Sequence, residues 1–168
     1  ELTRFMKALD DEPDQNAAAL LRLALVTGIR KGALLALQWS DCDFDREIIT
    51  LRGEVAKKGK TEHIPMSSAA RTVLQSIDRT SVFVFPGKDG NQRKDFRRIA
   101  RRVKERAQLP KDFRPIHGLR HNFASRLASS GQVDMYTLQK LLTHESPLMT
   151  QRYAHLADEA MKRASEIG

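Results

Sequence analysis

The segment NAAALLRLALVTG, residues 16–28, constrains the fold more than any other part of the chain. It is rich in strong helix formers, and Gly28 is a natural end for a helix because glycine tolerates a left-handed backbone. No apolar run in the sequence approaches the roughly 20 residues that cross a bilayer, so the segment predicts a helix of a globular domain. With 168 residues, 40% of them hydrophobic, the chain is long enough to bury one core.

The remaining patterns predict a mainly α domain with a small antiparallel β-sheet (α+β). Helices are expected over residues 4–11, 30–39, 67–78, 93–106, 117–129, 134–142, 147–154 and 157–166. Residues 47–51 and 61–66 are expected to pair as a hairpin around a polar turn, and residues 81–85 to form a further short strand. We therefore expect one compact unit.

Charge narrows the class of partner. The chain has a net charge of +8 and a pI near 9.9, which is typical of proteins that bind nucleic acid. Residues 93–106, RKDFRRIARRVKER, hold eight basic and two acidic residues and so supply +6. Phe96, Ile99, Ala100 and Val103 recur at helical spacing as one apolar stripe. A solvated helix face is one interpretation, and the overall positive charge favours the other, a helix that follows the phosphates of a nucleic acid.

Several dispersed side chains have the chemistry that metal-free phosphoryl transfer needs. Two arginines, Arg30 and Arg120, can hold non-bridging phosphate oxygens with paired hydrogen bonds. Tyr153 offers a phenol, which with a pKa near 10 needs help to lose its proton. The histidines His117 and His144, or a lysine, can exchange protons with the reacting groups. Each residue alone has a structural explanation, and the complete set favours catalysis.

Two further patterns leave alternatives open. The turn KKGK contains Lys57, Lys58 and Lys60. A functional role for these lysines and a role in keeping an exposed turn soluble explain them equally well. His117 and His121 lie four residues apart on one helix face, as metal ligands often do, but the zinc-protease pattern needs a glutamate where Gly118 stands. We therefore expect no metal and no other cofactor.

In order along the chain, these motifs resemble those of the catalytic domain of the tyrosine recombinases, the phage integrase family of site-specific DNA recombinases. The segment TGIRKGALLALQWSDCDF looks like the family's first arginine box, with Arg30 as the first phosphate-binding arginine. The segment KKGKTEHIPM resembles the hairpin that carries the catalytic lysine, and alignment from Pro65 favours Lys57, with Lys58 as the alternative.

The second half of the chain continues the resemblance. In IHGLRHNFASRLASSG, His117 and Arg120 correspond to the histidine and second arginine of an H-x-x-R motif. In LQKLLTHESPLMTQRYAHL, His144 corresponds to the late histidine and Tyr153 to the nucleophile. The resemblance covers essentially all 168 residues, which implies the DNA breaking-rejoining fold of this family's catalytic domain.

The resemblance implies a role for each side chain. Tyr153 attacks the scissile phosphate, which gives a 3′-phosphotyrosyl link and a free 5′-hydroxyl. His117 assists proton transfer at the tyrosine, and Lys57 protonates the leaving oxygen. The phosphate oxygens are bound by Arg30, Arg120 and His144. The phosphotyrosyl ester conserves the bond energy, so rejoining needs no ATP, and the arginines hold the phosphate charge without a metal.

Three supporting positions depart from the family pattern. Ala33 stands where an acidic residue usually follows the first arginine, Gly118 replaces a frequent aspartate, and Thr143 replaces the usual glycine before the late histidine. We expect weaker preorganisation of Arg30 and His117, and reduced activity is one consistent outcome.

The expected partner is double-stranded DNA. The residues expected to bind it outside the catalytic set are Lys58, Lys60, Arg97, Arg98 and Arg101. Residues 1–168 are read as a single catalytic domain that lacks the family's N-terminal core-binding and arm domains. The tail from residue 156 is expected to join four copies on paired DNA sites. No membrane partner is expected, and Cys42, the single cysteine, fits a reducing cytoplasm at the bacterial nucleoid.

Two alternative functions share these residues. A type IB topoisomerase uses the same tyrosine chemistry without a partner duplex. The other alternative is a DNA-binding module of the same fold, with weakened or absent catalysis. The residues of the second arginine box and the presence of the C-terminal tail favour a recombinase over a topoisomerase. The DNA-binding module draws support from the three altered positions alone, since all six principal residues are present.

Overall fold

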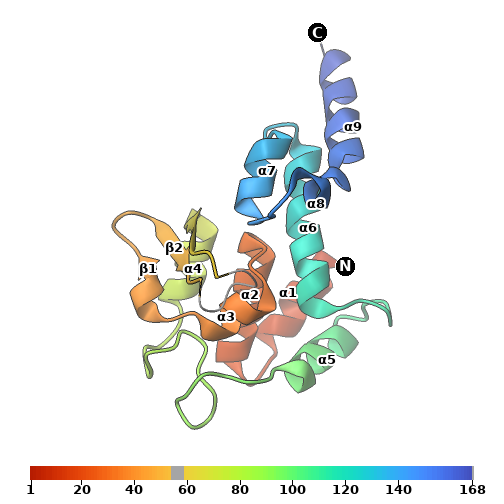
Figure 1. Ribbon diagram of the computed structural model, residues 1–168. Coiled ribbons are helices and arrows are strands. Elements are labelled where there is room, and N and C mark those ends of the chain that lie inside the picture. The colour runs from red at the N-terminus through yellow and green to blue at the C-terminus, as the bar shows by residue number, and fades with distance from the viewer. Residues whose placement is uncertain (54–58, 168) are drawn as a thin grey trace.

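The computed structural model describes residues 1–53 and 59–167 as a mainly helical fold with a three-stranded antiparallel sheet at one side (Figure 1). The helices are α1 (Leu2–Asp10), α2 (Gln15–Thr27), α3 (Lys31–Ala36), α4 (Ser68–Gln75), α5 (Arg97–Arg106), α6 (Pro115–Ser130), α7 (Met135–Leu141), α8 (Pro147–Gln151) and α9 (Ala154–Ser165). The sheet consists of β1 (Cys42–Asp43), β2 (Ile48–Leu51) and β3 (Glu62–Pro65). The expected fold class is confirmed.

Helix α2 forms the centre of the main core and packs against α1, α4 and α6. Asp14 caps its first turn by accepting a hydrogen bond from the backbone N–H of Ala17 at 2.9 Å. It ends at Gly28, whose φ of +66° is the left-handed conformation expected there. None of the helices in the described part of the chain is long and apolar enough to span a membrane.

The sheet differs from the expected hairpin in two ways. Strands β2 and β3 pair as predicted, with Ile49 opposite Ile64 and both side chains buried, while β1 adds a third strand that the sequence did not indicate. The prediction of a strand over residues 81–85 is wrong. Its backbone meets the segment after α3 at a single bridge between Phe83 and Gln38, because that segment turns at once into the short 3-10 helix η1 (Trp39–Asp41).

The arginines of α5 divide into two groups, because Glu12 holds one face of the helix. The Glu12 side chain is fully buried and accepts hydrogen bonds from Nε of Arg102 at 3.0 Å and Nη1 of Arg106 at 3.3 Å. The Arg102 hydrogen bond lowers the pKa of Glu12, so the carboxylate stays charged. Arg97, Arg98 and Arg101 form the other group: they are exposed and do not bond to Glu12.

Replacing Glu12 by glutamine is expected to lower the free energy of unfolding by about 3 kcal/mol at pH 7. The amide removes the counter-charge and turns one acceptor oxygen into a donor that faces two guanidinium groups. The carboxylate's contribution is present above its ordinary pKa of 4.5 and is lost as the pH falls through the lowered value in the folded protein. Urea unfolding at pH 7 and pH 3 measures both effects, and the difference between the two proteins should shrink at pH 3.

Glu105→Gln is the matched control for Glu12. Glu105 lies on α5 and pairs with Arg101 at 3.9 Å, with both side chains mostly exposed. Its loss is expected to change the free energy of unfolding by less than about 0.5 kcal/mol. Equal urea midpoints for the two variants would show that the buried ion pairs do not stabilise α5.

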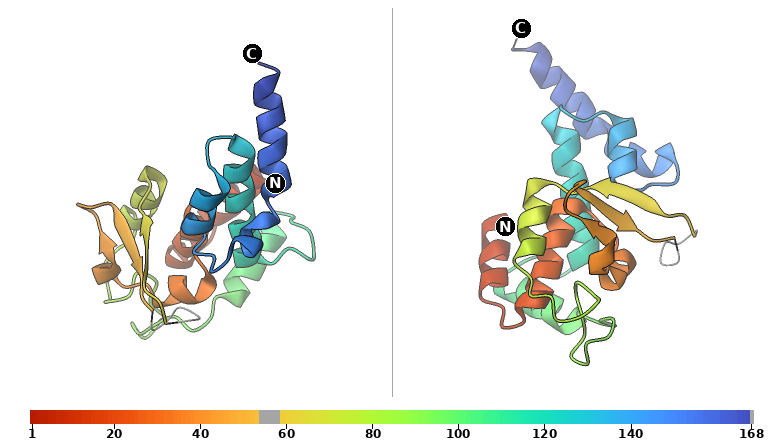
Figure 2. Two further views of the ribbon diagram at one scale, coloured as in Figure 1. Left: turned by 45° about the horizontal axis from the view of Figure 1, so that its top comes forward. Right: turned by 90° about the vertical axis from the view of Figure 1, so that its left-hand side faces the viewer.

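The C-terminal helices lie together at one end of the molecule (Figure 2). Their side chains form a second, smaller apolar cluster. Helix α6 joins the two parts, because Leu119 near its start belongs to the main core and its later residues do not. The buried members of the second cluster are Ala124, Ala128, Leu138, Leu142 and Tyr153. Helix α9 begins just after Tyr153 and extends away from the body of the molecule (Figure 1).

Candidate active site

A cleft of about 1070 Å³ lies between α3, α5, the start of α6 and the segment that holds residues 144–153. Its walls include five of the side chains that the sequence motifs singled out, and they come from segments far apart along the chain. These five residues are Arg30, His117, Arg120, His144 and Tyr153. Lys57, the sixth, and its alternative Lys58 lie outside the described residues.

Arg30 is held by Thr143. It precedes the first turn of α3, and its Nη1 donates to both the backbone oxygen of Thr143 at 3.1 Å and the side-chain Oγ1 at 3.0 Å. Thr143 has a φ of +50°, a left-handed conformation that is strained for a β-branched residue. Thr143 thus supplies two acceptors to Arg30, one of which a glycine would lack, whereas Ala33, three residues after Arg30, has no polar side chain to hold it.

Arg120 fastens the same two segments together. Its Nη1 donates to the backbone oxygen of Gly28 at 2.5 Å, and its Nη2 donates to that of Leu142. Burial and the neighbouring charge of Arg30 lower the pKa of Arg120 to about 10, so the guanidinium remains charged at neutral pH. Two cations therefore line one cleft, which suits an anionic ligand.

His144 lies beside both arginines. Its Nδ1 is 2.8 Å from Oγ1 of the buried Thr150, so when Nδ1 accepts that proton, Nε2 carries a hydrogen for a ligand. Burial and the charges of Arg120, Arg30 and Arg152 lower the pKa of His144 to about 4. The imidazole is therefore neutral at pH 7, and an anion between the arginines would raise its pKa.

Tyr153 is buried, with 5% of its surface exposed, and its hydroxyl bonds to a histidine that the sequence motifs did not assign. The Oη of Tyr153 is 2.8 Å from Nδ1 of His121. Burial raises the pKa of Tyr153, and the charges of Arg152 and Arg120 oppose this shift. The spacing of His117 and His121 was the available signal for His121, and it pointed towards a metal site instead.

Gly118 has a local explanation. A Cβ at this position would lie 2.2 Å from the ring of Phe113, so the ring fills the space that a side chain would need. His117 is exposed at the mouth of the cleft, with its ring 5.3 Å from that of His121. Among the described residues, no group of three or more His, Cys, Asp or Glu side chains is placed to hold a metal ion.

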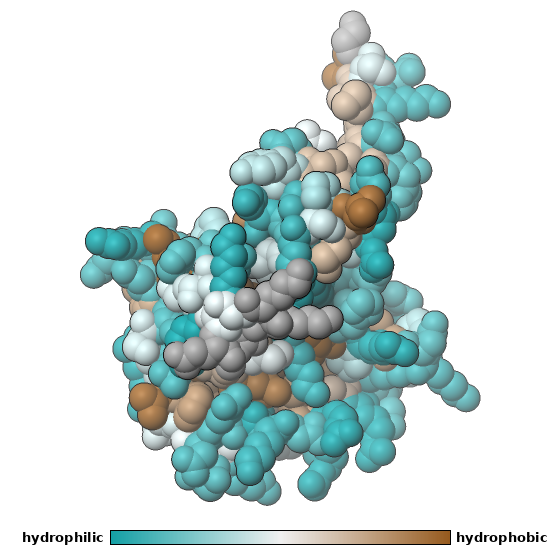
Figure 3. Space-filling view, in the orientation of Figure 1, coloured by the Kyte–Doolittle hydropathy of each residue, from teal (hydrophilic) through white to brown (hydrophobic). Residues whose placement is uncertain are grey.

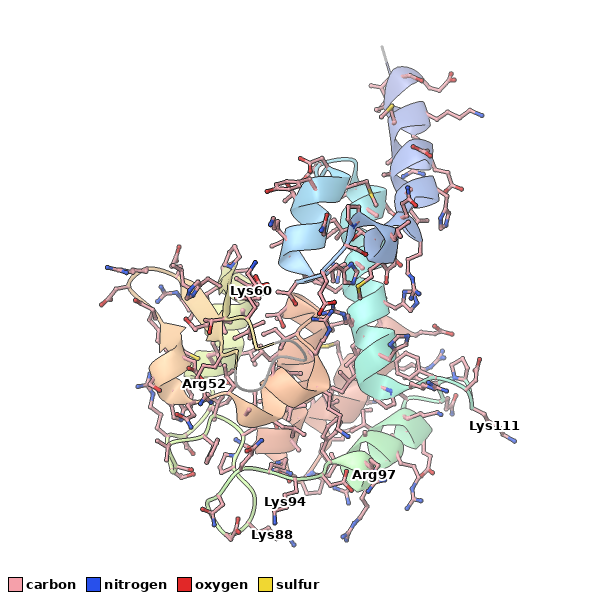
Figure 4. All side chains as sticks on the ribbon, in the orientation of Figure 1. Arg52, Lys60, Lys88, Lys94, Arg97 and Lys111 are labelled. Carbon is pink, nitrogen blue, oxygen red and sulfur yellow. The ribbon has the colours of Figure 1, made fainter. Side chains whose placement is uncertain are left out.

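Basic side chains continue from the site along the far wall of the cleft. Arg97, Arg101 and Lys104 of α5 line it, together with Lys31, Lys111 and Arg114. Figure 4 shows Arg97 at the start of α5 and Lys111 on the loop that leads to α6. Arg98 and Lys60 are exposed, and Figure 4 shows Lys60 beside the sheet. The face seen in Figure 3 is largely hydrophilic, with scattered apolar side chains.

Comparisons with known proteins agree with this fold. Residues 1–160 match the model of the phage integrase family. Tyrosine recombinase XerC of Xanthomonas campestris pv. campestris (strain B100) is 36% identical over 165 residues, which cover 93% of this chain and 49% of the relative. The chain thus spans about half the length of the curated relatives it matches.

Two solved structures are also similar. The catalytic domain of bacteriophage HP1 integrase superposes with a TM-score of 0.71 at 26% identity, covering 98% of this chain and 89% of that one. The Tn1549 transposon integrase in complex with circular intermediate DNA superposes with a TM-score of 0.78 at 21% identity, covering 95% of this chain and 64% of that one. At 21% identity, the similarity to the Tn1549 integrase shows a shared fold and nothing further.

Proposed function

The chain belongs to the phage integrase family, and on this basis we propose that it is the catalytic domain of a site-specific DNA recombinase. It breaks and rejoins DNA strands through a covalent 3′-phosphotyrosyl intermediate, without metal or ATP. The observation that carries the proposal is the convergence of two arginines, two histidines and a tyrosine on one basic cleft.

The phosphate of the scissile strand binds between Arg30 and Arg120, whose remaining N–H groups can point at its non-bridging oxygens. His144 donates a third hydrogen bond. These groups stabilise the charge that builds up as the phosphorus becomes five-coordinate. Both arginines already hold backbone oxygens of neighbouring segments, which supports a site that needs little rearrangement to receive the phosphate.

The phenol of Tyr153 attacks in line and forms the O–P bond while the bond to the 5′-oxygen breaks. The leaving oxygen takes a proton from Lys57 or Lys58, and His117 at the cleft mouth assists the proton transfers. The 5′-hydroxyl of another strand then attacks the phosphotyrosyl ester and releases the tyrosine. Each step exchanges one phosphodiester bond for another, so no external energy source is needed.

Double-stranded DNA is the proposed partner, and a DNA substrate implies action in the cytoplasm, at the nucleoid. The flanking phosphates run along the basic wall, where Arg97 and Arg101 line the cleft and Arg98 and Lys60 are exposed beside it. Asp112 is the single acidic residue among the described side chains that line this cleft. That imbalance of charge supports a phosphate track.

The double substitution of Arg97 and Arg101 by glutamine is expected to reduce the salt dependence of DNA affinity. Each lost phosphate contact lowers the slope of log K against log salt by about 0.9, so the slope falls by roughly 2. Fluorescence anisotropy with duplex DNA across a salt series measures it. The matched control replaces Lys7 and Arg46, which are exposed and do not line the cleft. A slope that falls equally in both would count against α5 as the DNA surface.

Assembly of four copies on paired DNA sites through the C-terminal tail is part of the proposal. Two apolar side chains support it: Met161 on α9 is 71% exposed and Ile167 beyond it is 88% exposed. Exposed apolar side chains at the end of a projecting helix are suited to burial against a neighbouring copy.

A nicked suicide substrate tests the function. After cleavage, the short fragment that carries the free 5′-hydroxyl diffuses away, so rejoining is impossible and the protein stays covalently bound to DNA. The product migrates as a covalent protein–DNA band on a denaturing gel. A second duplex with a free 5′-hydroxyl should then receive the strand. Relaxation of supercoils without transfer to a second duplex would favour a topoisomerase, and DNA binding without any covalent product would favour a non-catalytic module.

A further inference from the structure

His121, one turn of α6 beyond His117, is a hydrogen-bond partner of the tyrosine hydroxyl. The 2.8 Å distance between Tyr153 Oη and His121 Nδ1 is that of a good hydrogen bond. The two rings meet edge to face, with centroids 5.3 Å apart and planes at 77°. Since α6 carries His121 and the turn before α9 carries Tyr153, the bond joins the two walls that form the nucleophile's end of the cleft.

His117 is less well placed for the same task. The Tyr153 hydroxyl bonds to His121 and also interacts with Arg152, which is not a base, whereas His117 touches the edge of the His121 ring with centroids 5.3 Å apart. His117 is also exposed, whereas His121 is half-buried against the tyrosine. A base must be within hydrogen-bond reach of the proton that it removes, and His121 meets this condition.

The surroundings of His121 keep its imidazole neutral. The charged and titratable groups that face it are His117 on its own helix and Arg152 and Tyr153 on the segment opposite. Burial, His117 and Arg152 together lower the pKa of His121. A neutral imidazole has one ring nitrogen free to accept a proton, as a general base requires.

We propose that His121 is the general base that accepts the phenol proton of Tyr153 during strand cleavage, an inference that rests on the proposed function. As the Tyr153 O–H bond breaks, the proton moves to Nδ1 of His121 and the phenol oxygen bonds to phosphorus. The imidazolium is then stabilised by the bound phosphate diester. On rejoining, the phosphotyrosyl bond breaks and the departing tyrosine recovers the proton from His121.

Two substitutions separate proton transfer from packing. Phenylalanine at position 121 retains a ring against Tyr153 but has no acceptor, and glutamine offers a hydrogen-bond acceptor that is too weakly basic to take the proton. Both His121→Phe and His121→Gln are expected to slow covalent trapping about 100-fold in single-turnover reactions, at unchanged DNA affinity. His155→Gln is the matched control, because this exposed histidine lies two residues beyond the tyrosine.

The chemistry of the leaving group identifies which proton is affected. A substrate with sulfur in place of the bridging 5′-oxygen has a leaving group that needs no proton, so it rescues loss of a general acid. A base that acts on the nucleophile is still required with this substrate. The defect of both His121 variants is therefore expected to persist on the sulfur substrate, and full rescue, or a wild-type rate for His121→Phe, would overturn the assignment.

The tautomer of His121 gives a readout that does not depend on activity. Nitrogen-15 NMR of the DNA-free protein at pH 7 is expected to show Nδ1 unprotonated and the hydrogen on Nε2. A hydrogen on Nδ1 would overturn this inference alone, because that nitrogen would donate to the phenol and have no room for its proton. A wild-type protein that traps no DNA on either substrate would instead overturn the proposed function.

Discussion

Tyr153→Phe is expected to abolish covalent capture of DNA while DNA affinity stays within about twofold of wild type. The phenyl ring retains the packing of the second apolar cluster but has no oxygen to bond to phosphorus. Loss of the hydrogen bond to His121 should cost only about 1 kcal/mol of stability. Denaturing gels after incubation with a nicked suicide substrate measure the product.

Tyr136→Phe is the control for this experiment. The chain has two tyrosines, and Tyr136 is 68% exposed on α7, so its loss should leave trapping unchanged. If Tyr153→Phe trapped DNA as efficiently as wild type, another side chain would be the nucleophile. Trapping that disappears in the Tyr136 variant as well would show that neither result reports on the phenol.

Arg120→Lys should slow strand cleavage by about 10³-fold, the second largest effect expected. Lysine retains the positive charge but lacks the rigid fork, so it cannot hold the backbone oxygens of Gly28 and Leu142 and a phosphate at once. Single-turnover cleavage rates measure the loss, with DNA affinity and urea unfolding recorded in parallel. A rate within tenfold of wild type would remove Arg120 from the phosphate site.

Two comparisons separate the role of Arg120 in phosphate binding from its hydrogen bonds to the backbone. Arg163→Lys is matched to it, because Arg163 also donates to a backbone oxygen, that of Ser129 at 3.0 Å, but lies exposed on α9. Its cleavage rate should equal that of wild type. A neutral methylphosphonate at the scissile position lowers the demand for positive charge, so the Arg120→Lys defect should shrink on that substrate. A defect of the same size on both substrates would point to structural damage.

Local patterns predicted most of the fold because they describe local physics. The stripe of Phe96, Ile99, Ala100 and Val103 is buried, or nearly so, as its spacing indicated. The start of the same helix was placed too early. Arg93, which was expected inside it, lies before the helix and pairs with Asp14 at 3.1 Å, and α5 begins at Arg97. No short-range pattern contains the information that Asp14 lies nearby.

In the site, too, local motifs were predictive and contacts between distant residues were not. The order of the motifs was enough to single out five side chains that the fold gathers in one cleft, although their roles stay predictions. The bond between His121 and Tyr153 joins positions 32 residues apart and depends on how α6 faces the turn before α9. The division of the α5 arginines likewise depends on Glu12, 90 residues earlier than Arg102. Such pairings arise only from tertiary packing.

The nucleophile is held by the smaller of the two apolar clusters, and two of that cluster's five buried members are alanines. Small side chains bury little surface, so the free energy that keeps these last helices docked is a minor part of the total. Regions of this kind open and reclose without global denaturation. A high melting temperature would therefore report on the stability of the main core. It would say little about how often the Tyr153 hydroxyl occupies its position in the cleft.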